Sequence, residues 1–410
     1  MYKVYNRAEG LYQIKHVNSD KRLEVRMNQF EYISPCHFGL EAVLKRELTD
    51  LGCEITKVED GKVSYTGDMN TCARANMFLR TTERVLLKVA SFQAETFDEL
   101  FEKTKVIPWE EYLPKDGKFW VAKANSVNSK LFSPSDIQSI MKKAMVERMK
   151  TKYKQDWFEE SGNSYPIRVT ILKDEVTVCI DTSGESLHRR GYRKLTSKAP
   201  ITETLAAALI MLTPWNKDRI LVDPFCGSGT IPIEAAMIGA KIAPGIQRTF
   251  LAETWKEMYP ESTWMQARQE ANDLQQKETP MTIQGYDLDG EIIKAARQNA
   301  ILAGVDHLIH FQQKPVSELS SPKKYGFIIT NPPYGERLEE KEELPGLYKE
   351  MGKVFGALDS WSYYVISAYE DAQKYIGKQA DKNRKIYNGM IKTYFYQYMG
   401  PKPPKHTSVK

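Results

Sequence analysis

The sequence is poor in the residues that build metal sites and disulfide frameworks. Its 410 residues include five cysteines with no Cys-x-x-Cys pair, and its six histidines are scattered. This spacing indicates neither a zinc site nor a set of disulfides, so we expect reduced thiols and no metal. The patterns His-Glu-x-x-His and Gly-x-Ser-x-Gly are also missing, which argues against a zinc peptidase or a serine hydrolase.

Long apolar runs are missing as well. No run approaches the length of a membrane span, and the start of the chain, MYKVYNRAEGLYQIK, has no signal-peptide core. With 41% apolar residues, the chain has the length and composition for two or three domains. We therefore expect a soluble, cytoplasmic protein with no membrane partner. The formal charge of +5 is too small for this length to indicate nucleic-acid binding by itself.

The first sign of chemistry is a glycine-rich turn in the segment LVDPFCGSGTIPIE, residues 221–234. It has the pattern of a short strand that ends in Asp223, a loop, and a helix. Gly227 and Gly229 lack a β-carbon, so the backbone can approach a ligand closely. An acid that can hold a cationic amine, next to such glycines, favours S-adenosylmethionine, although similar turns also occur for packing reasons alone.

Two other nucleotide sites fit this turn less well. A phosphate-binding P-loop has a lysine before its Ser/Thr, whereas here Gly229 precedes Thr230. A dinucleotide loop has a third glycine where this chain has Pro232. ATP and NAD are therefore the weaker candidates.

A second apolar run, residues 281–286, ends in Asp287-Leu288-Asp289-Gly290 and leads into a helical pattern. An acid at the tip of the second strand of such a sheet can accept two hydrogen bonds from a ribose diol. Asp287 is the candidate for this contact. Either aspartate could instead cap the following helix, and the two roles are compatible.

A third strand, residues 325–330, opens into Asn331-Pro332-Pro333-Tyr334-Gly335. The prolines fix the backbone and have no N–H, so the Asn331 side chain and the Pro332 carbonyl are held as acceptors. Tyr334 can stack on a flat ring. The run suits an exocyclic amine on a nucleobase, whose two protons would be accepted while its lone pair attacks a methyl group. Adenine N6, cytosine N4 and guanine N2 all meet this description.

The motifs DPFCGSGT, GYDLD and NPPYGERL, in this order, resemble those of class I S-adenosylmethionine-dependent amino-methyltransferases. The chain is most similar to the RlmL-type enzymes, which methylate guanine N2 in large-subunit (23S) rRNA. LHRRGY (187–192) and APITETLAAA (199–208) resemble that family's connector and first helix, and IAPGIQR (242–248) its insertion after the cofactor loop. The front half resembles the family's ferredoxin-like and THUMP modules.

The resemblance implies an α/β fold: a class I, Rossmann-like methyltransferase domain with an antiparallel final strand pair, preceded by α+β ferredoxin-like and THUMP modules. The signal for the final pair is Asn388-Gly389 between two strand-like runs. We divide the chain into an extension of unknown role (1–27), a ferredoxin-like module (28–68), a THUMP module (69–182), a linker (183–198), a methyltransferase domain (199–398) and a disordered tail (399–410).

The cofactor implied is S-adenosyl-L-methionine. The residues expected to bind it are Asp223, Phe225, Gly227, Gly229, Thr230, Asp287, Glu203 and Asn331. Asn331, Pro332 and Tyr334 are the expected catalytic residues. In the family an acid usually faces the adenine after the third strand; Pro315 stands there in this chain, so no residue is assigned to that contact.

The implied partner is structured RNA, either 23S rRNA or a large-subunit precursor. Two basic segments could contact phosphates: the run 188–198, and a helix predicted from Ser133 onward, with Pro134 in its first turn. The residues we assign to RNA are Arg189, Arg190, Arg193, Lys142 and Lys143. Basic runs also occur as plain solvated surface.

Two alternatives remain open at this stage. One is methylation of another exocyclic base amine, such as adenine N6, in RNA or DNA. The other is a non-catalytic RNA-binding ribosome-assembly factor that retains a methyltransferase fold. The intact Asp223, Gly227, Asp287 and Asn331 argue against the second.

Overall fold

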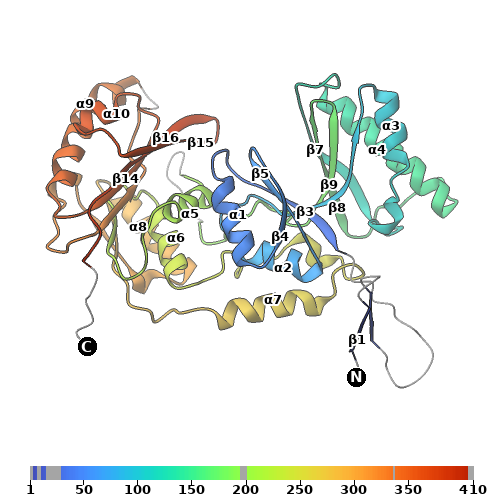
Figure 1. Cartoon of the computed structure of the whole chain (residues 1–410), viewed down its shortest axis with the longest axis horizontal. Helices are drawn as coiled ribbons and strands as arrows, with labels where there is room; N and C mark the ends of the chain where they lie inside the picture. The colour runs from blue at the N-terminus through green and yellow to red at the C-terminus, as the bar shows by residue number, and fades with distance from the viewer. Residues whose placement is uncertain (1–2, 7–10, 15–28, 194–200, 336–337, 405–410) are drawn as a thin grey trace.

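The computed structural model describes residues 3–6, 11–14, 29–193, 201–335 and 338–404. Two seven-stranded sheets organise this part of the chain, the catalytic sheet on the left and the front sheet to its right in Figure 1. No helix within these ranges combines the length and apolar character needed to cross a bilayer.

The front sheet has the strand order β4-β5-β3-β6-β9-β8-β7. Its strands are β3 (Phe30–Pro35), β4 (Glu54–Glu59), β5 (Lys62–Gly67), β6 (Leu86–Gln93), β7 (Lys118–Val127), β8 (Ser164–Leu172) and β9 (Glu175–Asp181). Its helices are α1 (Glu41–Asp50), α2 (Met69–Phe78), α3 (Phe97–Lys105) and α4 (Pro134–Tyr153). All neighbouring strands are antiparallel except β7 and β8.

This sheet is continuous across the two front modules. β3 pairs with β6 through Tyr32 opposite Leu87 and Ile33 opposite Leu86. The ends of its helices follow local rules: the Ser133 hydroxyl accepts the Asp136 N–H at the start of α4, with Pro134 at the first position, as predicted.

The catalytic sheet has the order β12-β11-β10-β13-β14-β16-β15. Its strands are β10 (Leu221–Asp223), β11 (Ile283–Asp287), β12 (Ile309–Gln313), β13 (Phe327–Thr330), β14 (Ser362–Ser367), β15 (Lys382–Asn388) and β16 (Ile391–Tyr398). Its helices are α5 (Glu203–Met211), α6 (Thr230–Gly239), α7 (Glu261–Asp273), α8 (Gly290–Ala303), α9 (Leu338–Gly356) and α10 (Ala372–Ile376). The strands from β12 to β14 are parallel, and β16 enters antiparallel between β14 and β15. The predicted fold class, including the antiparallel final pair, is confirmed.

The final hairpin turns one residue later than the sequence suggests. Asn388 pairs with Ile391, so Gly389 and Met390 form the turn rather than Asn388 and Gly389. Gly389 has the positive φ, 61°, that such a turn requires.

Helix α7 joins the two halves of the molecule. It belongs to the insertion after α6, yet it runs beneath the front module (Figure 1). Arg74 of α2 forms a two-pronged ion pair with Glu270 of α7, at 2.8 and 2.9 Å. Trp255 and Trp264 of this insertion are buried in the same apolar core as the front strands. The front and catalytic parts therefore share a core.

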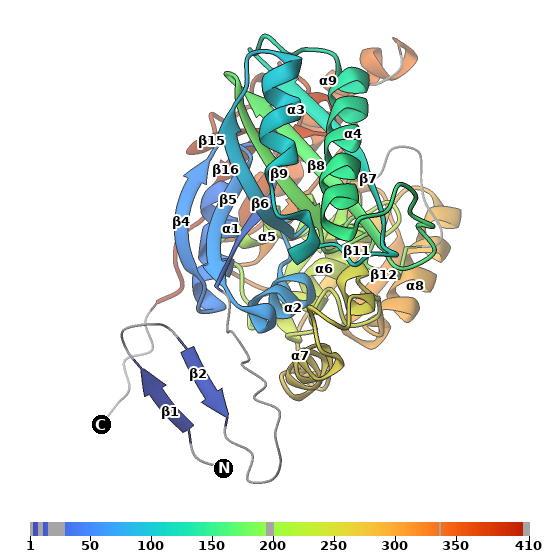
Figure 2. The same cartoon turned by 90° about the vertical axis from the view of Figure 1, so that its right-hand side faces the viewer.

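The extension contributes a small hairpin of its own. β1 (Lys3–Asn6) and β2 (Leu11–Ile14) pair with each other and, among the described strands, with no others. Figure 2 shows the hairpin projecting away from both large sheets. The final residues of the predicted tail, 405–410, lie outside the described ranges.

Candidate cofactor and acceptor site

The three predicted motifs meet at one edge of the catalytic sheet. β10 lies between β11 and β13, all three parallel, so the acids and the amide that follow these strands come together at their carboxyl ends. A cavity of about 1250 Å³ opens there. Of the predicted site residues, its lining includes Asp223, Phe225, Gly227, Thr230, Asp287, Asn331, Pro332 and Tyr334.

Asp223 supplies a buried carboxylate at the floor of this cavity. It accepts hydrogen bonds from the Thr330 hydroxyl at 2.6 Å and the Phe225 N–H at 3.1 Å. Burial raises the pKa of Asp223 to about 7, because these neutral donors offset only part of the lost hydration. A cationic amine placed beside it would complete the charge balance.

Asp287 holds the neighbouring loop. Its carboxylate accepts the N–H of Gly227 at 3.0 Å and that of Asp289 at 3.1 Å, and burial raises its pKa. Each carboxylate oxygen keeps a further acceptor position for a diol. Asp289 caps α8 by accepting the N–H groups of Glu291 and Ile292.

The Asn331 loop presents an acceptor at the cavity wall. The Oδ1 atom of Asn331 is buried and, within the part of the chain that the structure describes, has no hydrogen-bond partner. Such an atom is costly unless a ligand satisfies it. The loop is braced from behind: the Tyr348 hydroxyl donates to the Pro333 carbonyl at 3.1 Å and lies 2.6 Å from the Ser367 hydroxyl oxygen.

Two predicted cofactor residues lie outside the cavity lining. Gly229 has φ 87°, and a β-carbon there would lie 2.9 Å from the Phe311 ring, so this glycine serves the turn and its packing. Glu203 is buried and forms an ion pair with Arg193 at 3.0 Å, behind the cavity wall.

The structure corrects one RNA prediction outright. Arg190 is buried, forms an ion pair with Glu234 at 3.4 Å, and donates to the carbonyls of Leu187 and Arg80. It therefore cannot reach a phosphate, and it joins the linker to both halves of the chain. The basic run did not reveal this because its members look alike in sequence.

The remaining predicted RNA contacts divide by exposure. Arg189 is exposed and pairs with Glu185, and Lys143 is exposed. Lys142 is committed to Glu160 and the Phe119 carbonyl, and Arg193 to Glu203 and the Ile201 carbonyl. The rest of the predicted basic run, residues 194–198, lies outside the described residues.

One wall of the cavity was not anticipated. Glu343, Leu344, Leu347 and Glu350 of α9 line it. Their spacing of one, three and three residues places them on one helix face, which is the signal that could have found them. Pro315 also lines the cavity, beside Lys314 and Ser317. No group of three or more metal-binding side chains occurs among the described residues.

Five parallel strands, an antiparallel strand between the last two positions, and an acid-and-glycine loop at the first strand define a class I S-adenosylmethionine-dependent methyltransferase. Three family models match the chain: an RlmL ferredoxin-like domain at residues 31–86, a THUMP domain at 94–181 and an RMKL-like methyltransferase domain at 190–397. The chain belongs to the RMKL-like methyltransferase family, and the predicted cofactor is confirmed.

Two curated relatives show how far the likeness extends. A protein of Bacillus subtilis (strain 168), YpsC, which is provisionally named an RNA methyltransferase, is 46% identical over 92% of this chain and 98% of its own. The ribosomal RNA large subunit methyltransferase K/L of Cellvibrio japonicus is 32% identical over 88% of this chain. This chain covers 50% of that longer protein.

Solved structures agree on the whole fold. A possible methylase from Clostridium difficile 630 has a TM-score of 0.89 and 52% identity, over 92% of this chain and 100% of its own. An N6-adenine-specific DNA methylase, so named by inference, from Listeria monocytogenes has 0.86 and 49%, over 92% and 97%. SMU.472, provisionally a methyltransferase and complexed with S-adenosylhomocysteine, has 0.86 and 40%, over 92% and 99%.

Proposed function

We propose that this protein transfers a methyl group from S-adenosylmethionine to the exocyclic N2 amine of a guanine in large-subunit (23S) rRNA. The observation that carries the proposal is the buried, unpartnered Oδ1 of Asn331 in the same cavity as Asp223 and Asp287. The THUMP family match and the names of the K/L relatives support RNA, and specifically large-subunit rRNA, as the substrate.

The chemistry requires little more than orientation. The cofactor supplies a methyl group on a positively charged sulfur, which is already a good leaving group. Asp223 holds the amine end of the cofactor and Asp287 its ribose. Asn331 Oδ1 and the Pro332 carbonyl accept the two protons of the base amine, and Tyr334 stacks on the base, so that the nitrogen lone pair faces the methyl group. The base must leave its helix to reach this position.

The α9 wall favours guanine over adenine. The base-pairing edge of guanine presents N–H donors at N1 and N2, whereas adenine has an acceptor at N1. Glu343 and Glu350 bring carboxylates to the cavity lining, and an ionised carboxylate can only accept hydrogen bonds. A carboxylate facing N1 would satisfy guanine and repel the adenine lone pair.

Adenine N6 methylation of DNA is the second candidate, because the Listeria neighbour carries that name. An assay of methyl transfer decides between the two. Purified protein and labelled cofactor are offered 23S rRNA from a strain that lacks this protein, and duplex DNA in parallel. Label in guanosine of the RNA supports the proposal, and label in deoxyadenosine contradicts it. Cofactor binding with transfer to neither acceptor would favour the assembly-factor reading.

A further inference from the structure

The β15–β16 hairpin carries charge of one sign only. Its four charged residues within 382–398 are Lys382, Arg384, Lys385 and Lys392, and it contains no acid. Lys385 and Lys392 are exposed, and neither forms an ion pair with a carboxylate among the described residues. Each ammonium lies over a tyrosine ring of the hairpin instead, at 5.2 Å from the ring centre.

The tip of this hairpin touches the catalytic loop. The Nδ2 atom of Asn388 donates to the Tyr334 hydroxyl at 3.1 Å, so the turn is anchored to the ring expected to stack on the target base. Beyond this contact, the side chain of Met390 is 97% exposed. A fully exposed apolar side chain next to an active site is more typical of a contact surface than of a fold requirement.

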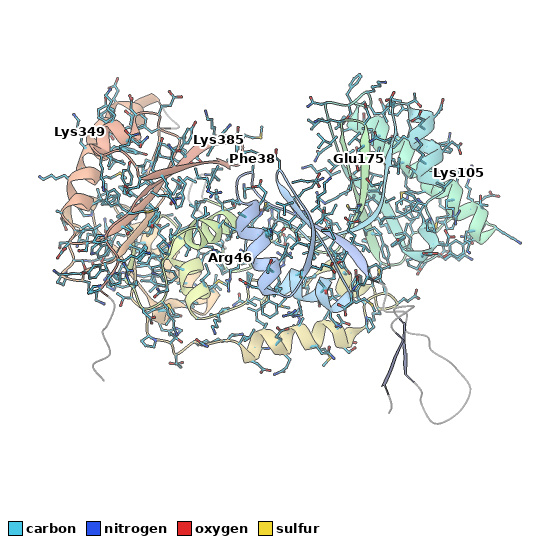
Figure 3. The ribbon with its side chains drawn as sticks, viewed as in Figure 1. Phe38, Arg46, Lys105, Glu175, Lys349 and Lys385 are labelled. Atoms are coloured by element: carbon cyan, nitrogen blue, oxygen red, sulfur yellow. The ribbon has the colours of Figure 1, made fainter. Side chains whose placement is uncertain are left out.

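The outer strand of the hairpin also touches the front module. Arg384 donates to the Gly39 carbonyl at 2.8 Å, and the rings of Phe38 and Tyr387 meet edge to face at 6.3 Å. A β-carbon on Gly39 would lie 2.8 Å from the Lys385 carbonyl, so the two backbones are in close contact. Figure 3 shows Phe38 and Lys385 where the two halves meet. The hairpin thus forms one surface from the front module to the catalytic loop.

We propose that this surface binds the single-stranded RNA on either side of the target nucleotide; the proposal rests on the proposed function. Lys385 and Lys392 contact phosphates, and Phe38 and Met390 contact bases unstacked when the target leaves its helix. Positive charge interleaved with exposed rings is the combination that binds single strands without reading their sequence. The contact between Asn388 and Tyr334 places this surface at the entrance to the site, while the THUMP module supplies binding farther away.

Filter binding of transcribed 23S rRNA to a double variant, Lys385→Ala with Lys392→Ala, tests the proposal. We expect RNA affinity to fall about tenfold, and the slope of log affinity against log salt to become shallower by about 1.4, since each phosphate contact to a single strand contributes ~0.7. Cofactor affinity should stay at the wild-type value, because neither lysine lines the cavity.

The matched control is Lys323→Ala with Lys324→Ala, which removes the same charge just before β13, at the opposite edge of the sheet. Equal loss in both variants, or wild-type affinity and slope in the hairpin variant, would overturn the proposal. Methyl transfer by the wild-type protein is measured on the same RNA. If transfer is missing but the lysine effect on binding remains, the proposed function fails and the docking surface stands.

Discussion

At the scale of single residues, the site depends on two buried oxygen groups that lack full compensation. Asp223 has only neutral donors, and Asn331 Oδ1 has no partner among the described residues. Both cost stability in the free protein and gain a partner when ligands bind. Sequence patterns located both residues, but only the structure shows that one is half protonated near neutral pH and the other unsatisfied.

The raised pKa of Asp223 predicts that cofactor binding depends on pH. A carboxylate pairs with the cationic amine, whereas a carboxylic acid does not, so S-adenosylhomocysteine should bind about five- to tenfold more weakly near pH 6 than near pH 7.5. Calorimetry at several pH values measures this. In Asp223→Asn the affinity should be lower and its pH dependence largely lost; a wild-type slope in that variant would contradict the assignment.

The effect on stability has the opposite sign. The folded pKa of Asp223, about 7, lies above its ordinary value of 3.8, so the folded state binds more protons between these values. The contribution of this group to stability is present at low pH and is lost as the pH rises through about 7.

Asn331 is expected to act on the reacting amine rather than on the cofactor. Asn331→Ala should therefore lower kcat by about 100-fold or more and leave the affinity for S-adenosylhomocysteine within a few-fold of wild type, because the lost contacts exist only with the acceptor base. Steady-state kinetics and calorimetry on the same preparation separate these effects. An equal loss in both quantities would mean that the loop, not the contact, was damaged.

At the scale of elements, local signals served well wherever a helix or strand is defined by its own residues. The capped start of α4 and the Asp60-Gly61 hairpin between β4 and β5 follow from sequence. Helix α7 was not predicted, because its buried face is Trp264, Ala267 and Ala271 with Thr263, and small residues give a weak apolar pattern. Its partner, α2, lies about 190 residues earlier in the chain, as the pair Arg74 and Glu270 shows.

Helix α9 shows a different limit. The apolar pattern indicated a start near Leu344, next to Pro345, because proline is favoured in the first turn of a helix. The helix begins at Leu338 and carries Pro345 inside it. The position of this start matters for the cavity, since α9 forms one wall of it.

The turn between β10 and α6 should be sensitive to a single methyl group. Gly229→Ala combines a positive φ of 87° with a β-carbon 2.9 Å from Phe311 and 3.1 Å from Ala296, so we expect a loss of about 2–4 kcal/mol. Gly304→Ala is the control: its φ is 71°, but no atom lies within 4 Å of the added carbon. Denaturant unfolding of both variants measures the difference, and equal losses would show that packing against Phe311 contributes nothing.

At the scale of the whole molecule, the front and catalytic parts behave as one folded body. Tyr165 stacks on Trp255 at 4.7 Å, and the hydroxyls of Tyr32 and Tyr259 lie 3.3 Å apart, each pair crossing between the two parts. Arg190 continues this connection through the linker, from the Arg80 carbonyl to Glu234 of α6. Domain divisions drawn from sequence cannot show that insertion and front module share a core.

A fragment that begins at Ser183 should therefore fold poorly. It would expose Trp255, Tyr259 and Trp264, each buried in the full chain, at a cost of about 1.5–3 kcal/mol per side chain. Size-exclusion chromatography and the Tm report the outcome. Removal of residues 1–26 is the control, since the hairpin formed by β1 and β2 pairs with no other described strand. A monomeric Ser183 fragment with a wild-type Tm would show that the shared core is dispensable.

The central claim concerns one atom of one nucleotide, and mass spectrometry of nucleosides from large-subunit rRNA tests it most directly. The rRNA is prepared from a strain that lacks this protein, and from the same strain supplied with the wild-type or the Asn331→Ala protein. Our account predicts that the deletion strain loses one N2-methylguanosine, that the wild-type protein restores it and that the variant does not. An unchanged guanosine profile with a missing methyladenosine would contradict the guanine assignment.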